Sequence, residues 1–118
     1  MAKVLIVDDS LFIRSQLDRL LTEHGYETVL AEDGEQAISL YASARPDIVL
    51  MDITMPKVNG LDALAQIHVQ DPGAKVIMLT ALDQGPIASR AVHMGAKDFL
   101  VKPILPANLL MALHKVLR

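Results

Sequence analysis

Five short runs of aliphatic and β-branched residues recur along the chain and predict five strands. The runs cover residues 3–7, 27–31, 47–51, 75–79 and 97–101. The first, third and fourth runs are almost uninterruptedly apolar, which is typical of parallel strands that are covered by helices on both faces. The second run contains Glu27 and Thr28, and we therefore expect it to lie at an edge of the sheet.

The segments between these runs carry apolar residues at helical spacing, and each has a start or stop signal. The signals along the chain are a terminating Gly25, a capping box from Asp33 to Gln36, a capping Asn59, a stop at Asp71-Pro72-Gly73, a first-turn Pro86, a terminating Gly95 and an opening Pro106. Strands and helices that alternate with short connections predict an α/β fold, a doubly wound (βα)5 sheet in one domain spanning residues 1–118.

Composition narrows the class of protein. Of the 118 residues, 52% are hydrophobic, but the longest apolar run, residues 109–113, is far too short to span a membrane. The chain has no cysteine, which excludes disulfides, thiol catalysis and cysteine-bound zinc. A net charge of −3 and 3% aromatic residues argue against a nucleic-acid surface. Two aspartates interrupt the N-terminal apolar run before a signal peptide can form, so we expect a cytoplasmic protein.

Polar residues follow every predicted strand, and after four of them helix capping is not the simpler explanation, as it is for Glu32 and Asp33 after the second strand. Asp8 and Asp9 follow the first strand, Asp52 the third, Thr80 the fourth and Lys102 the fifth. In a parallel sheet these positions share the carboxyl edge, where α/β proteins bind their ligands. The sequence therefore predicts a site with three carboxylates, one hydroxyl and one ammonium group.

Three carboxylates in one crevice need a compensating cation. Two like charges about 4 Å apart repel by about 4 kcal/mol at an effective dielectric constant of 20. Oxygen ligands without histidine or cysteine suit Mg²⁺. A carboxylate can also act as the nucleophile in phosphoryl transfer, in which a cation and a hydroxyl stabilise the phosphoryl oxygens. The pattern thus points to Mg²⁺-dependent formation of an aspartyl phosphate.

Four motifs in this order resemble response-regulator receiver domains. They are V-L-I-V-D-D-S at 4–10, D-I-V-L-M-D-I-T-M-P-K-V-N-G at 47–60, V-I-M-L-T-A at 76–81 and G-A-K-D-F-L-V-K-P at 95–103. Over essentially its full length the chain is similar to stand-alone chemotaxis regulators of the CheY type. The resemblance implies a flavodoxin-like sheet with strand order 2-1-3-4-5 and a phosphoacceptor signalling switch, not an enzyme.

The resemblance also implies roles for the acidic residues. Asp52 would accept the phosphoryl group from the phosphohistidine of a histidine kinase. Asp9 and Asp52 would bind Mg²⁺ directly, together with the backbone carbonyl of Thr54, while Asp8 would act mainly through water. Lys102 would pair with a phosphoryl oxygen.

Further implied roles concern the switch. Thr80 would move its hydroxyl onto the phosphoryl group, and Phe99 would then swing into the vacated space. The small Ala81 would let its backbone N–H approach the phosphoryl group, and the Lys102–Pro103 peptide bond is expected to be cis. The surface of the fourth helix, fifth strand and fifth helix would change shape and bind a target protein.

Some positions depart from the family pattern. Residue 99 is Phe where chemotaxis regulators often carry Tyr, and Ile104 stands where Phe is frequent. Thr54 and Leu82 occupy positions that tune dephosphorylation in this family. Because both are bulkier and less polar than many residues found there, we expect a long-lived aspartyl phosphate.

Other interpretations compete with a chemotaxis regulator. A phosphorelay intermediate, or the receiver part of a transcriptional regulator, would show nearly the same motifs. A nucleotide-binding Rossmann domain would need glycines where Asp8-Asp9-Ser10 stands. A haloacid-dehalogenase-like phosphatase would need a second Asp at position 54 and usually a cap domain. A non-phosphorylated interaction module would typically lack the acidic pair, Asp52 or Lys102.

The expected partners follow from the resemblance. The phosphoryl donor would be a histidine kinase, and a phosphatase is a further candidate. Because the chain ends after the last predicted helix, we expect a monomer that signals by docking to another protein, with the flagellar motor switch as the leading target. Neither nucleic acid nor a membrane is expected as a direct partner.

Overall fold

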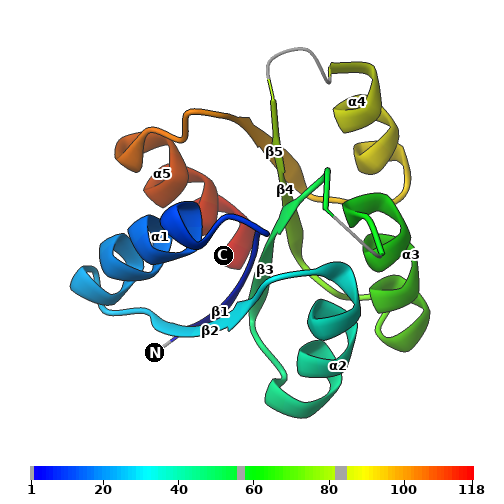
Figure 1. Ribbon diagram of the computed structural model, residues 1–118, viewed down its shortest axis with the longest axis horizontal. Coiled ribbons are helices and arrows are strands. Elements are labelled where there is room, and N and C mark those ends of the chain that lie inside the picture. Colours follow the sequence, from blue (N-terminus) through cyan, green and yellow to red (C-terminus); the bar gives the residue numbers. More distant parts are fainter. Residues whose placement is uncertain (1, 56–57, 82–84) are drawn as a thin grey trace.

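Five parallel strands form one sheet in the order β2-β1-β3-β4-β5, as expected (Figure 1). The computed structural model describes residues 2–55, 58–81 and 85–118. The strands are β1 Lys3–Val7, β2 Glu27–Ala31, β3 Ile48–Asp52, β4 Val76–Thr80 and β5 Asp98–Val101. The helices are α1 Leu11–Glu23, α2 Gly34–Ala44, α3 Gly60–Gln70, α4 Gly85–His93 and α5 Pro106–Leu117. The α/β fold class and the flavodoxin-like topology are thus confirmed.

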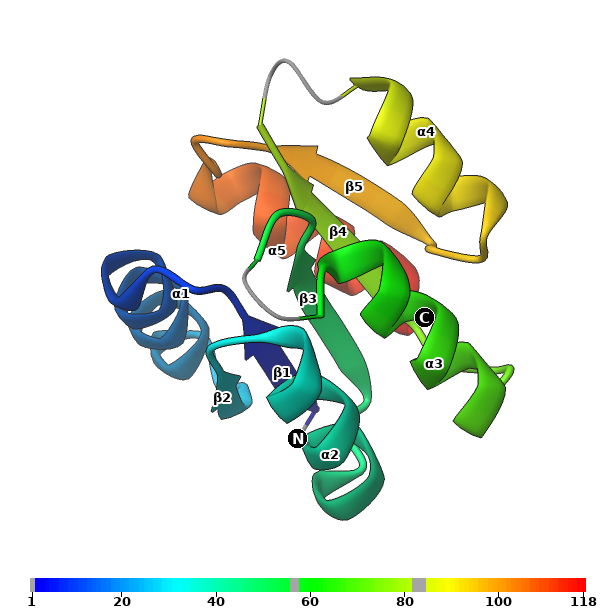
Figure 2. The same cartoon turned by 45° about the vertical axis from the view of Figure 1, so that its right-hand side comes forward.

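Helices cover both faces of the sheet. α1 and α5 lie on one face, and α2, α3 and α4 lie on the other (Figures 1 and 2). Successive residues of a strand point to opposite faces, so Ile6 and Leu50 pack towards α1 and α5, while Leu5 and Val49 pack towards α2 and α3. This explains the continuous apolar runs of β1, β3 and β4. The strand β2 is at an edge and half-exposed, as its Glu and Thr predict.

The predicted boundaries of three strands shift by one residue. β3 and β4 begin and end one residue later than predicted, and β5 begins one residue later. At the start of β3, the carboxylate of Asp47 accepts a hydrogen bond of 2.7 Å from the backbone N of Lys3. At the other end, Asp52 pairs with Leu79 and Thr80 pairs with Val101, so the sheet continues through these polar residues. The backbone of both residues is therefore held rigidly by the sheet.

The predicted helix caps are confirmed. The side chain of Asp33 accepts a hydrogen bond of 2.8 Å from the backbone N of Gln36, and Asn59 caps α3 in the same way. Gly25 follows α1 with a φ of 85°, a backbone conformation that favours glycine. Within the described part of the chain, no helix has the length and apolar character that crossing a membrane requires.

Candidate functional site

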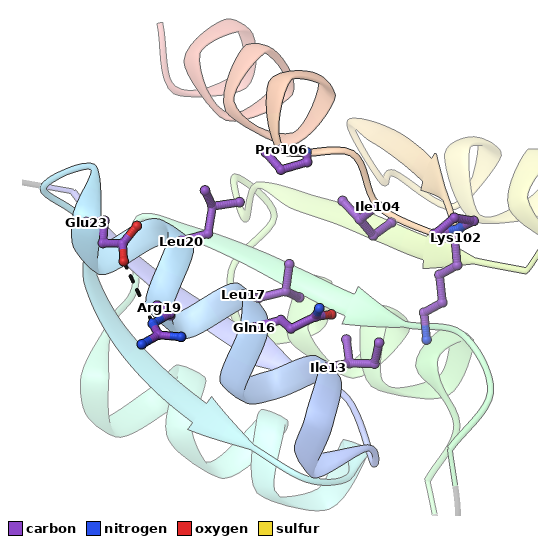
Figure 3. A pocket seen from close by; sticks show the side chains of 10 residues that line it. Ile13, Gln16, Leu17, Arg19, Leu20, Glu23, Lys102, Ile104 and Pro106 are labelled. Atoms are coloured by element: carbon purple, nitrogen blue, oxygen red, sulfur yellow. Dashed lines mark ion pairs between the residues drawn. The ribbon is translucent and has the colours of Figure 1, made fainter.

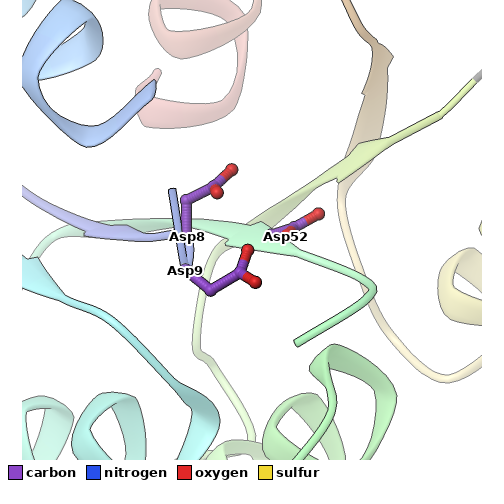
Figure 4. A group of neighbouring side chains, drawn as sticks. All are labelled: Asp8, Asp9 and Asp52. Carbon is purple, nitrogen blue, oxygen red and sulfur yellow. The ribbon is translucent and has the colours of Figure 1, made fainter. Parts of the chain in front are cut away.

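Three aspartates meet at the carboxyl edge of the sheet. Asp8 directly follows β1, and Asp52 is the last residue of the neighbouring strand β3. Carboxylate oxygens of Asp8, Asp9 and Asp52 all lie within 4.8 Å of one another, and the side chains project to the same side of the strand ends (Figure 4). Asp8 and Asp52 are almost fully buried, whereas Asp9 is exposed. The structure therefore assembles the predicted acidic cluster.

Lys102, which directly follows the edge strand β5, also contacts this cluster. Its ammonium nitrogen donates a hydrogen bond of 2.9 Å to Oδ2 of Asp8 and one of 3.2 Å to Oδ1 of Asp52. Its backbone N donates to the carbonyl of Thr80 at 2.7 Å, which ties the residue to the end of β4. The peptide bond between Lys102 and Pro103 is cis, as predicted. Hydrogen bonds thus link residues at the carboxyl ends of four strands.

The electrostatics of the cluster favour an additional cation. Burial and then the neighbouring charge of Asp8 raise the pKa of Asp52 to about 6, while Lys102 acts in the opposite direction and Asp9 adds to the rise. Burial by itself lowers the pKa of Lys102, but its hydrogen bond to Asp8 and the charges of both aspartates outweigh this and raise it. One ammonium group faces three carboxylates. A donor set made only of carboxylate oxygens fits a hard divalent ion such as Mg²⁺.

The remaining predicted site residues lie around this cluster. Thr80 is the last residue of β4 and is buried, and its hydroxyl donates a hydrogen bond of 3.2 Å to the carbonyl of Ala81. Thr54 and Ala81 are exposed at the ends of β3 and β4. Phe99, in the edge strand β5, is 37% exposed. Leu82, the other position expected to tune dephosphorylation, lies outside the described residues.

Sequence reasoning missed three residues that support the aspartates. Ser10 donates its backbone N–H to Oδ1 of Asp8 at 2.9 Å and caps α1 with its hydroxyl, a role that its position before a helical stripe could have revealed. Arg14 donates from Nη1 to the carbonyl of Asp8 at 2.6 Å. Gly60 packs so tightly that a Cβ atom there would overlap the carbonyl oxygen of Asp52. Nothing in the sequence around Arg14 or Gly60 indicates that these residues contact the aspartates.

A groove of about 440 Å³ adjoins the site between α1 and the segment that follows β5. Ile13, Leu17 and Leu20 line its α1 side, and Ile104 and Pro106 line the other (Figure 3). Lys102 borders the groove, but none of the three aspartates lines it. The acidic cluster therefore lies beside this groove and not inside it.

A buried carboxylate cluster that a lysine bridges, at the carboxyl edge of a 2-1-3-4-5 sheet, defines a phosphoacceptor class of signalling domains. The family model of the response regulator receiver domain matches residues 4–114, and the chain belongs to this family. Such a domain is a phosphoacceptor switch and not a catalytic enzyme.

Known relatives narrow the type of receiver. The chain is 46% identical over 115 residues to the chemotaxis protein CheY of Thermotoga maritima, which covers 97% of this chain and 96% of that protein. It is similar to a solved CheX–CheY–BeF3–Mg²⁺ complex from Borrelia burgdorferi, with a TM-score of 0.94, 39% identity, and coverage of 99% of this chain and 90% of that chain. A probable transcriptional regulator of Guillardia theta, ycf27, is 43% identical over 118 residues, which cover 98% of this chain but 45% of that protein.

Proposed function

We propose that residues 1–118 form a receiver that accepts a phosphoryl group on Asp52 in a Mg²⁺-dependent reaction and then binds a target protein. The observation that carries this proposal is the position of Asp52, whose carboxylate lies 3.2 Å from the Lys102 ammonium and beside the carboxylates of Asp8 and Asp9. The charges of Asp8, Asp9 and Lys102 all act on the Asp52 carboxylate.

The chemistry of transfer follows from these neighbours. A carboxylate oxygen of Asp52 attacks the phosphorus of a phosphohistidine, the P–N bond breaks, and the ring nitrogen leaves with the bonding electron pair and takes up a proton. Lys102 stabilises the negative charge on a phosphoryl oxygen. Mg²⁺, when bound by Asp9, Asp52 and the Thr54 carbonyl, supplies the positive charge that offsets repulsion between the carboxylates and the phosphoryl group.

Thr80 and Phe99 are proposed to convert phosphorylation into a change of surface. In the structure the Thr80 hydroxyl is bonded to the Ala81 carbonyl, and that bond must be exchanged for one to the phosphoryl group. The backbone N–H of Ala81 is a second proposed donor. Phe99 is 37% exposed in edge strand β5, two residues before the exposed Val101, so a rotation of its ring would change the face formed by α4, β5 and α5.

We infer that a histidine kinase is the phosphoryl donor and that the process served is chemotaxis, with a flagellar motor switch protein as the target. The similarity to the Thermotoga maritima chemotaxis protein along the full length of both chains supports this inference. The alternative is a phosphorelay intermediate or the receiver part of a transcriptional regulator, which the similarity to half of the Guillardia theta protein favours.

The test is covalent labelling. Incubation with acetyl phosphate and Mg²⁺ should add the mass of one phosphoryl group, about 80 Da, to the intact chain. Asp52→Asn should abolish the adduct, whereas Asp62→Asn, at an exposed position in the first turn of α3, should leave it unchanged. No adduct on the wild-type chain would favour a non-phosphorylated interaction module. An adduct that persists in Asp52→Asn would place the phosphoacceptor elsewhere.

A second measurement separates the chemotaxis assignment from the alternative. The chain saturated with beryllofluoride and Mg²⁺ should bind a peptide from a flagellar motor switch protein more tightly than the untreated chain, with NMR shift changes in α4, β5 and α5. Absence of any difference between the treated and the untreated chain would contradict the chemotaxis assignment and favour the alternative.

A further inference from the structure

We propose that Arg14 is a positioning residue, which holds the peptide between Asp8 and Asp9 in the orientation needed to bind a divalent cation. This inference rests on the proposed function, in which the acidic cluster binds Mg²⁺. Arg14 is the fourth residue of α1 and is half-buried. Its side chain reaches back over the start of the helix, and Nη1 donates a hydrogen bond of 2.6 Å to the carbonyl oxygen of Asp8.

The other polar groups of Asp8 are also held. Its backbone N donates to the carbonyl of Ala31 in β2 at 3.2 Å. Oδ1 accepts from the backbone N of Ser10 at 2.9 Å, and Oδ2 accepts from Lys102 at 2.9 Å. These three contacts hold the backbone N–H and the carboxylate of Asp8 in place. The bond from Arg14 is different, because it acts on the carbonyl that leads into Asp9.

The orientation of Asp9 depends on that peptide. The carbonyl of Asp8 and the N–H of Asp9 belong to one rigid plane, so a hydrogen bond to the carbonyl restricts the rotation that would carry the Asp9 carboxylate away from Asp52. Asp9 is exposed, and burial does little to hold its side chain. The carboxylate oxygens of Asp8, Asp9 and Asp52 lie within 4.8 Å of one another, so a rotation of this plane that moves the Asp9 carboxylate away would separate the ligands.

Arginine suits this role for two reasons. The guanidinium group stays protonated, so its hydrogen bond to a carbonyl is charge-assisted and therefore stronger than a neutral one. It also donates to a backbone carbonyl and not to a carboxylate oxygen. Arg14 therefore leaves the carboxylate oxygens to the cation, whereas the ammonium of Lys102 hydrogen-bonds to one oxygen of Asp8 and one of Asp52.

The experiment compares Arg14→Met, Arg14→Lys and Arg19→Met with the wild-type chain. Arg19 lies on the same helix, its side chain is 84% exposed, and it pairs with Glu23 at 3.8 Å, so Arg19→Met removes the same charge without touching Asp8. Mg²⁺ affinity is measured by calorimetry. Amide hydrogen exchange at Asp9 and Ser10 is measured in the metal-free protein, and the free energy of unfolding shows that each variant is folded.

Arg14→Met is expected to weaken Mg²⁺ binding by about tenfold or more, as is typical when a group that orients a metal ligand is lost. It should also accelerate exchange at Asp9 and Ser10. Arg14→Lys should recover part of both losses, and Arg19→Met should resemble the wild type. If Arg14→Met does not fold, Arg14→Gln takes its place, with weaker Mg²⁺ binding expected for the same reason.

Three outcomes would overturn either the positioning role or the proposed function. Equal Mg²⁺ affinities for the folded Arg14 variant and for Arg19→Met would overturn the positioning role of Arg14 while leaving the proposed function intact. A wild-type chain that binds no Mg²⁺ at all would overturn the proposed function itself. Unchanged exchange at Asp9 and Ser10 in the metal-free Arg14 variant would overturn the positioning role whatever the affinities are.

Discussion

The ammonium nitrogen of Lys102 lies 3.2 Å from Oδ1 of Asp52, and the two residues are 50 positions apart in the sequence. The ion pair crosses from the end of β5 to the end of β3, with β4 between them. Asp52 is 4% exposed, so this contact is largely shielded from water. The lysine is therefore already in contact with the proposed phosphoacceptor carboxylate, as a preorganised electrostatic site requires.

Lys102→Met should both destabilise the fold and slow phosphorylation. The substitution leaves the buried carboxylates of Asp8 and Asp52 without their shared cation, which we expect to cost about 2 kcal/mol in the free energy of unfolding. Loss of the charge that stabilises the transferred group should slow phosphorylation by acetyl phosphate about 100-fold or more. Urea unfolding and time-resolved mass measurements check the two effects. Lys97→Met, at an exposed position, is the control, and equal losses in both variants would contradict the role of Lys102.

Asp52→Asn should stabilise the metal-free protein at neutral pH. The folded-state pKa of about 6 lies above the ordinary value of 3.8, so the folded chain holds a proton that the unfolded chain releases. The stability of the wild type should therefore fall as pH rises from about 4 to 6, by about 2–3 kcal/mol in all. Urea unfolding in EDTA should show a gain for Asp52→Asn at pH 7 that disappears below about pH 4. Mg²⁺ should reduce that gain, and a less stable Asp52→Asn at pH 7 would contradict the prediction.

Gly60→Ala should destabilise the protein, because the added methyl group overlaps the carbonyl oxygen of Asp52 and backbone cannot yield as a flexible side chain does. The expected loss is about 2 kcal/mol or more in the free energy of unfolding. Gly85→Ala provides the matched control in another helix, since nothing lies within 4 Å of a Cβ atom there. That change should be neutral or mildly stabilising. Equal effects at both positions would show that tight packing at Gly60 is not the cause.

Tyr41→Phe should weaken the link between α2 and the end of α3 in a pH-dependent way. The Tyr41 hydroxyl donates a hydrogen bond of 2.7 Å to Oδ2 of Asp71. That bond, followed by one from the backbone N of Gly73, lowers the pKa of Asp71. A lowered folded-state pKa means that the stabilisation is fully present above the ordinary value of 3.8 and is lost as pH falls through the folded-state pKa.

The measurement is urea unfolding by circular dichroism between about pH 7 and pH 3. Wild type should lose more stability than Tyr41→Phe over the acid part of this range, so the two curves should converge there. Tyr26→Phe is the control, because Tyr26 packs against the hydrophobic cluster of α1 and α5, on the face of the sheet opposite to Tyr41. Parallel curves for wild type and Tyr41→Phe would show that the hydrogen bond does not carry the pH dependence.

Much of the fold could be predicted from local pattern alone. Continuous apolar runs predict the central strands, because both faces of such a strand are buried. Asp33 and Asn59 predict the starts of their helices, because a capping side chain binds backbone N–H groups that are close in sequence. The one-residue shifts of β3 and β4 were not predictable from hydrophobicity. They arise because the backbone pairing of Asp52 and Thr80 continues the sheet through residues whose side chains are polar.

The sequence by itself determined which side chains reach the carboxyl edge, since Asp8, Asp52 and Lys102 directly follow or end parallel strands. Their strand order came from the family resemblance and not from periodicity. Only the tertiary structure decided that one ammonium is shared by two buried carboxylates, that the pKa of Asp52 is raised, and that Arg14 holds the carbonyl of Asp8. The physical reason is that burial and hydrogen-bond geometry depend on residues far apart in the chain, whereas strand and cap signals are local.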